Sequence, residues 1–155
     1  MPRVLAIDYG TVRHGIAVSD ELGMLAHPLE TVPAANEGQS FRRIAQIVQE
    51  RRIETLVLGI PVRLNGVEGT AAARVRAWGA KLRASLPASL RWEEVDECLT
   101  TASAAAKLRE AGRSVKQSRA IIDQAAAVEI LQIFLDRQAP LLPWPDEEDE
   151  EDYLP

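Results

Sequence analysis

The spacing of short apolar segments in the amino-terminal third most restricts what this chain can fold into. Residues 3–8 and 14–19 are two such segments, and the Tyr-Gly-Thr between them (residues 9–11) has the composition of a turn. This spacing predicts a β-hairpin. A third apolar segment, residues 24–32, follows another turn, so we expect three consecutive strands in an antiparallel arrangement.

After these three expected strands, the spacing of the apolar residues changes. Residues 40–52 carry apolar side chains at helical spacing, with Ser40 as the expected N-cap. Residues 55–62 are continuously apolar, which is typical of a buried central strand reached through a helical crossover. The later patterns predict a helix from a Thr70 cap to about residue 86, a strand over residues 90–97, and helices over residues 100–112 and 116–138. This order indicates a mixed α/β sheet with an antiparallel flank.

Composition sets the domain organisation. The chain has 155 residues, of which 46% are hydrophobic and 26% charged, so residues 1–139 are expected to form one globular domain. Residues 140–155 are expected to form a disordered, solvating tail. The single cysteine, Cys98, can form neither an internal disulfide nor a thiolate metal site, which favours a reducing compartment. No segment approaches the roughly 18 apolar residues of a membrane span, so we expect a cytoplasmic protein without a membrane partner.

The net charge of −5 hides a basic domain. Residues 146–152 are all acidic, and without these seven the remaining 16 of 23 acidic residues face 18 Lys and Arg, which leaves about +2. The basic residues gather in residues 42–52, 74–83 and 107–119. Such clusters can bind a phosphate backbone, although each also fits the solvated face of an amphipathic helix.

Three acidic residues far apart in the sequence form the candidate active site. Asp8 ends the first predicted strand and Glu97 ends the last, and the carboxyl ends of parallel strands line the ligand crevice of open α/β sheets. Asp123 shares a helical stripe with Ala127 and Ile130, so we expect it to face inward, where a carboxylate needs a partner. Each acid alone also has a structural explanation, as a turn residue, a surface charge or a favourable charge near a helix N-terminus.

A divalent metal ion would compensate the electrostatic repulsion among three neighbouring carboxylates. Inward-facing carboxylates repel one another unless a cation compensates them. Oxygen ligands without His or Cys favour Mg²⁺ or Mn²⁺ over zinc. Two such ions about 3.5 to 4 Å apart can activate a water molecule and stabilise the leaving oxygen of a phosphodiester. The residues alone therefore predict metal-assisted phosphoryl chemistry.

Four segments in order resemble the YqgF family, also called RuvX, of RNase H-like nucleases. They are VLAIDYGTVRHGIAVSDELGMLAHPLETV, VLGIPVRLNGVEGTAA, VDECLTTASA and IIDQAAAVEILQIFLD, and they span residues 4–136. The resemblance implies an RNase H-like fold with a mixed five-stranded sheet, and a Mg²⁺- or Mn²⁺-dependent nuclease whose metal ligands and catalytic acids are Asp8, Glu97 and Asp123. The family is described as trimming the 5′ end of pre-16S rRNA, and its members resemble Holliday junction resolvases. RNA, as pre-rRNA, is thus the favoured partner, and structured DNA is the alternative.

The sequence departs from the family pattern at two positions. Cys98 stands where the family usually has Arg, after Asp96-Glu97, and Val12 stands where it commonly has Lys. Positive charge near the acids is therefore reduced. The residues expected to contact phosphate, each of which also fits an ordinary turn, cap or surface position, are Gly10, Thr11, Arg13, Arg63, Thr101, Lys116 and Arg119.

Two readings from other functional classes remain open at this point. Residues 7–20 also resemble the phosphate-binding hairpin of the actin, chaperone and sugar-kinase ATPases, although those proteins close two such domains around a nucleotide. Alternatively, the chain is a nucleic-acid-binding module whose acids no longer cleave, with a tail that mimics nucleic acid. The sequence is compatible with exonuclease or endonuclease action and with a monomer or a homodimer.

Overall fold

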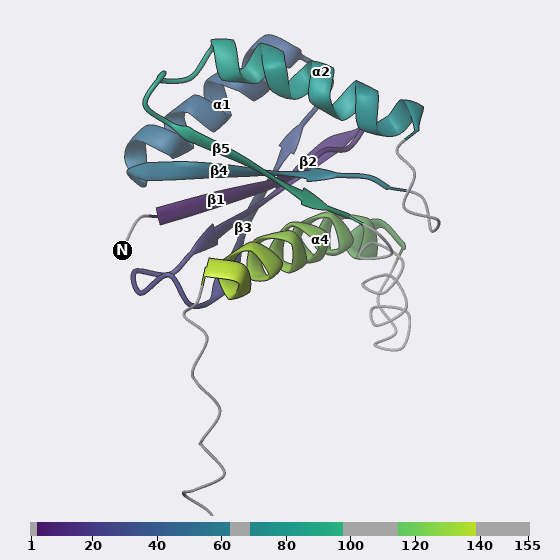
Figure 1. Ribbon diagram of the computed structural model, residues 1–155. Coiled ribbons are helices and arrows are strands. Elements are labelled where there is room, and N and C mark those ends of the chain that lie inside the picture. The colour runs from purple at the N-terminus through teal and green to yellow at the C-terminus, as the bar shows by residue number, and fades with distance from the viewer. Residues whose placement is uncertain (1–2, 63–68, 98–114, 139–155) are drawn as a thin grey trace, which may run out of the picture.

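A five-stranded sheet forms the centre of the molecule (Figure 1). The structure is a computed structural model that describes residues 3–62, 69–97 and 115–138, with side chains of the last segment described from residue 124 onward. The strands are β1 (Arg3–Asp8), β2 (Arg13–Ser19), β3 (Ala26–Pro33), β4 (Ile53–Ile60) and β5 (Arg91–Asp96). The helices are α1 (Glu37–Glu50), α2 (Thr70–Ala84) and α4 (Val115–Gln138).

The strand order is β3-β2-β1-β4-β5. The first three strands pair antiparallel, whereas β4 pairs parallel with both β1 and β5. The mixed sheet with its antiparallel flank is therefore confirmed. The helix predicted over residues 100–112 and the predicted acidic tail lie outside the described residues.

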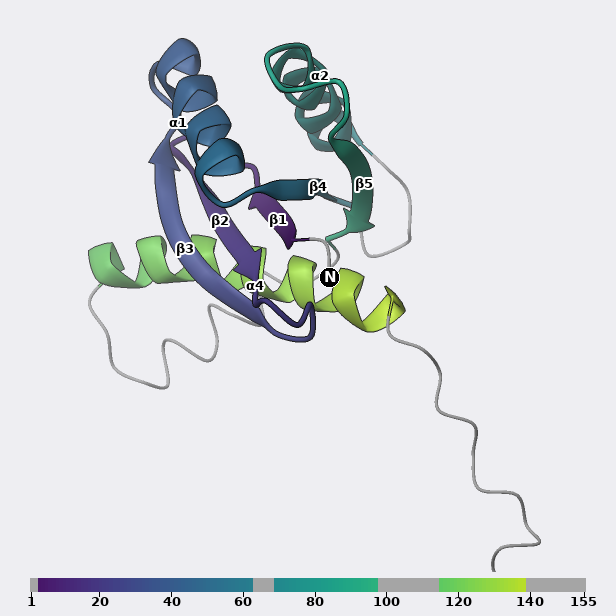
Figure 2. The same ribbon diagram turned by 90° about the vertical axis from the view of Figure 1, so that its left-hand side faces the viewer.

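Helices cover both faces of the sheet: α1 and α2 lie over one face, and α4 crosses the other (Figures 1 and 2). Alternation along β1 sends Leu5 and Ile7 into the core beneath α1 and α2, and Val4 and Ala6 into the core beneath α4. Burial on both faces explains why the central strands are almost continuously apolar. None of the described helices combines the length and apolar character needed to cross a membrane.

Both predicted N-caps are wrong. Helix α1 begins three residues earlier than Ser40, after Asn36, whose side-chain oxygen accepts a hydrogen bond from the Gln39 backbone N–H at 3.0 Å. Ser40 is buried inside the helix, and its hydroxyl donates to the Pro33 carbonyl. Helix α2 follows Gly69, which provides no side-chain cap, and Thr70 is its first residue. The N-cap of α1 is thus the amide side chain of Asn36, one helical turn before Ser40, the residue that the apolar pattern predicts.

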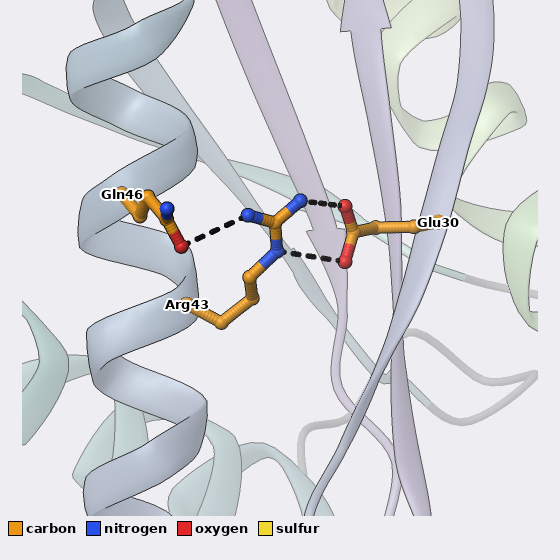
Figure 3. A network of polar contacts seen from close by, with 3 residues as sticks. All are labelled: Glu30, Arg43 and Gln46. Atoms are coloured by element: carbon orange, nitrogen blue, oxygen red, sulfur yellow. Dashed lines mark hydrogen bonds and ion pairs between the residues drawn. The ribbon is translucent and has the colours of Figure 1, made fainter.

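Helix α1 is tied to the edge strand β3 by a polar network (Figure 3). The Arg43 guanidinium donates to both carboxylate oxygens of Glu30, and its third nitrogen donates to the Gln46 side chain at 3.0 Å. This pairing raises the pKa of Arg43 above its ordinary value. One cation of the first basic cluster is thus engaged within the protein.

Candidate active site

Asp8 occupies a rigid position at the end of β1. This strand is hydrogen-bonded on one side to β2 and on the other to β4, and Asp8 itself lies opposite Gly15. Continuing the alternation of Val4 and Ala6 places Asp8 on the face covered by α4. Only 8% of Asp8 is exposed. A carboxylate held this way keeps its position without depending on a loop.

Glu97 directly follows the edge strand β5. Its backbone N–H donates to the Ile60 carbonyl at 2.8 Å, which extends the pairing of β5 with β4 by one residue. Its carboxylate reaches over Gly59: a Cβ added there would lie 3.1 Å from Glu97 Oε2 and 2.4 Å from Ile130 Cδ1. Because Gly59 has no side chain, Glu97 and the α4 residue Ile130 can both approach the strand closely.

The sheet register brings the two carboxylates to one cleft. Gly59 pairs with Val95, and Leu58 of the same strand pairs with Ile7, so Asp8 and Glu97 flank the carboxyl end of β4 from opposite sides. The cleft has a volume of about 360 Å³. The described residues that line it are Asp8, Tyr9, Gly10, Thr11, Pro61, Ala71, Arg74, Val75 and Glu97.

Asp123, the third predicted acid, lies in α4, one helical turn before the buried residue Ala127. The amino-terminal end of α4 is on the side toward which β1 and β4 run (Figure 1). Its side chain lies outside the described residues, within which no group of three or more His, Cys, Asp and Glu is gathered. The carboxylates of Asp8 and Glu97 are the oxygen ligands that Mg²⁺ and Mn²⁺ prefer, so the described donors fit such an ion.

The turn after Asp8 is built around a buried histidine. His14 is 1% exposed and packs against Tyr9 and Trp78, with ring centroids 5.0 and 4.5 Å away. Its Nδ1 accepts a hydrogen bond from the Gly10 N–H at 3.1 Å. Burial lowers the pKa of His14 to about 4, which keeps the ring neutral and able to accept this bond. Apolar alternation marked His14 as a strand residue and gave no sign of this role.

Gly10 is required by the same turn. A Cβ on Gly10 would lie 2.1 Å from the Arg13 carbonyl oxygen, a backbone atom that cannot move aside as a side chain can. Gly10 and Thr11 line the cleft, as expected of phosphate-contacting residues, whereas the half-buried Arg13 is not among the described lining residues.

The other predicted phosphate contacts are not described at the side-chain level. Arg63 and Thr101 lie outside the described residues, as does Cys98, and Lys116 and Arg119 are placed only by the backbone of α4. The cation that does line the cleft is Arg74 from the second turn of α2. In the sequence, Arg74 is only one member of the basic cluster of residues 74–83, because helical periodicity does not show which loop or strand end each residue of a helix faces.

Comparison with known proteins matches nearly the whole chain. A family model with the description "RuvX: Holliday junction resolvase" matches residues 2–137. A protein of Cutibacterium acnes named "Putative pre-16S rRNA nuclease" is 46% identical over 134 residues, which cover 86% of this chain and 81% of that protein. A protein of the same name from Streptomyces avermitilis is 44% identical over 137 residues, covering 88% and 86%.

Solved structures share the fold at low sequence identity. T. thermophilus RuvC in complex with a Holliday junction substrate has a TM-score of 0.54 and 18% identity, with 89% of this chain and 96% of that chain covered. Fowlpox virus resolvase with Holliday junction DNA has a TM-score of 0.55 and 8% identity, with 89% and 99% covered. Together with the sheet order, these likenesses confirm the RNase H-like fold expected from the sequence.

Proposed function

This chain belongs to the RuvX family, and from that premise we propose that it is a nuclease that hydrolyses phosphodiester bonds with the help of divalent metal ions. One observation carries the proposal: Asp8 and Glu97, which are 89 residues apart in the sequence, line the same cleft. Hard carboxylate ligands at the edge of a rigid sheet suit Mg²⁺ or Mn²⁺.

Asp8 and Glu97 would hold the metal, with Asp123 as the third ligand. When bound, two such ions supply an activated water molecule and stabilise the leaving oxygen of the phosphodiester. The protein's own contribution is positioning. The sheet holds Asp8, Gly59 leaves room for Glu97, and the turn at Gly10 and Thr11 forms the wall along which the substrate phosphate lies.

The proposed substrate is the 5′ extension of pre-16S rRNA, cleaved in the cytoplasm during ribosome biogenesis. The names of relatives that are 42–46% identical to this chain support RNA. The description of the family supports a four-way DNA junction as the second candidate. Both candidate substrates, the rRNA extension and the DNA junction, would be cleaved by the same metal chemistry, and they differ in the shape of the nucleic acid.

The test compares wild type with Asp8→Asn on labelled RNA that carries the 5′ extension of 16S rRNA, and on a four-way DNA junction. We expect wild type to cleave the RNA with Mn²⁺ or Mg²⁺ and to stop when chelator is added. Asp8→Asn should lose cleavage because the amide lacks the charge that binds the metal. Cleavage of the junction alone would move the function to DNA resolution.

A matched pair of variants isolates the second carboxylate. Glu97→Gln should lose most of the activity, whereas Asp96→Asn should keep it, because Asp96 is exposed and is not among the described residues that line the cleft. If neither nucleic acid is cut while wild type and Asp8→Asn bind RNA equally, the chain is a binding module. Saturable ATP binding would favour the ATPase-like reading instead.

A further inference from the structure

Arg74 stands out among the basic residues by its position. It lies in α2 on the same helical face as Ala71 and Val75, and all three line the cleft that holds Asp8 and Glu97. Arg74 is exposed, and it is the one cation among the described residues of the cleft wall. Within the described part of the chain, no carboxylate forms an ion pair with its guanidinium.

Neighbouring cations on the same helix are engaged elsewhere. Arg76 donates to both carboxylate oxygens of Glu94, at 3.1 and 3.3 Å, and the Arg83 guanidinium lies 5.7 Å from the ring centre of Trp92. Neither is among the described residues that line the cleft. Lys81 of the same cluster pairs with Glu37 of α1 at 3.8 Å. The cluster of residues 74–83 therefore divides into cations that contact β5 or α1 and one cation, Arg74, that lines the candidate active site.

The charge of the cleft explains what Arg74 could do there. Two carboxylates repel the phosphates of an approaching strand wherever a metal ion does not compensate them. An arginine beside them reduces this repulsion, and its planar guanidinium can donate two parallel hydrogen bonds to one phosphate. The position after Glu97, which carries Arg in the family pattern, is Cys98 in this chain and cannot provide that contact.

We propose that Arg74 binds a backbone phosphate of the nucleic acid strand in this cleft and so positions the strand over Asp8 and Glu97. This inference rests on the proposed nuclease function. It assigns substrate binding to a residue of α2 that lines the same cleft as the turn at Gly10.

The experiment compares Arg74→Gln with Arg76→Gln, two exposed arginines on one helix that differ in whether they line the cleft. Cleavage of the labelled pre-16S 5′-extension RNA is measured with Mn²⁺. For Arg74→Gln we expect kcat/KM to fall about tenfold to a hundredfold, the usual effect of removing a hydrogen-bonded charge from a phosphate. Arg74→Lys should recover part of the loss, because it keeps the charge without the planar fork. Arg76→Gln should stay within about twofold of wild type.

A binding measurement separates this inference from the proposed function. The affinity of each variant for the same RNA is measured in the non-cleaving Asp8→Asn background over a range of salt concentrations. Loss of one phosphate contact lowers the slope of log affinity against log salt by about 0.7 for a single strand. We expect this change for Arg74→Gln and not for Arg76→Gln.

The outcomes are distinct. If wild type cleaves no nucleic acid but Arg74→Gln still lowers the salt slope, the nuclease proposal fails and the phosphate contact stands. If Arg74→Gln and Arg76→Gln have equal slopes and equal kcat/KM, the assignment of Arg74 is overturned. Equal thermal unfolding temperatures of the two variants would show that neither result comes from misfolding.

Discussion

The two carboxylate-bearing sides of the cleft are built in different ways. On the Asp8 side, the wall is a turn whose backbone hydrogen bond is local: the Gly10 N–H donates to His14 four residues later. On the Glu97 side, the carboxylate is placed by Gly59 and Ile130, which are distant from it in the sequence. A locally determined wall depends on turn chemistry and a buried ring, whereas the other wall depends on how α4 packs on the sheet.

The largest effect on stability is expected on the Asp8 side, from Gly10→Ala. The added Cβ would meet the Arg13 carbonyl oxygen at 2.1 Å, so the turn would have to open and lose its hydrogen bond to His14. We expect the free energy of unfolding to fall by about 3 kcal/mol in urea titration. Gly38→Ala is the control, because its Cβ would have only ordinary contacts and α1 should gain up to about 1 kcal/mol. Equal stability of Gly10→Ala and wild type would contradict a rigid turn.

The pH dependence of stability should come next in size. The pKa of His14 is about 4 in the folded protein and 6.5 in the unfolded chain, so between these values only the unfolded chain binds the proton. The free energy of unfolding should therefore fall as pH drops from about 6.5 to 4, by at most about 3 kcal/mol, and this contribution should be constant above and below that window.

Two histidine variants isolate that contribution. His14→Gln should lose this part of the pH dependence when urea titrations are repeated between pH 4 and 7. The control, His27→Gln, should keep it, because His27 is exposed. Identical pH profiles for His14→Gln and His27→Gln would mean that the buried ring does not couple the turn to proton binding.

The smallest loss of stability, but a specific loss of activity, is expected on the Glu97 side from Gly59→Ala. The Cβ would approach the flexible end of Ile130 at 2.4 Å, which can shift at a cost of about 1 to 2 kcal/mol. It would also press on the Glu97 carboxylate, so cleavage should fall further than the fraction of unfolded protein explains.

A double variant separates the two consequences of that substitution. Gly59→Ala with Ile130→Val removes the methyl group closest to the added Cβ and should be no less stable than Gly59→Ala alone. Its cleavage rate should stay low because the contact with Glu97 remains. Full wild-type activity in either variant would mean that the observed position of Glu97 is not needed for catalysis.

Sequence patterns predicted the end of β1 correctly and the end of β5 within one residue, but placed the end of β4 two residues too late and both N-caps incorrectly. The ends of β1 and β5 are marked by the change from apolar residues to Asp8 and to Asp96-Glu97, a signal carried by neighbouring residues. The start of α1 depends on Asn36 rather than Ser40, because a cap is selected by which side chain reaches a free N–H, and two polar residues one turn apart look alike in sequence.

The sequence by itself determined the order of the described strands and helices, the position of the turn after Asp8 and the acids at the ends of β1 and β5, because each is marked by residues within one strand or one turn. Only the tertiary structure decided that Asp8 and Glu97 share a cleft, that Gly59 makes room for Glu97, and that Arg74 rather than Arg76 lines the site. These relations depend on the register of β4 between β1 and β5 and on the packing of α2 and α4. Periodicity identifies the buried face of each element, but the position of one element along another is settled only when the side chains pack together.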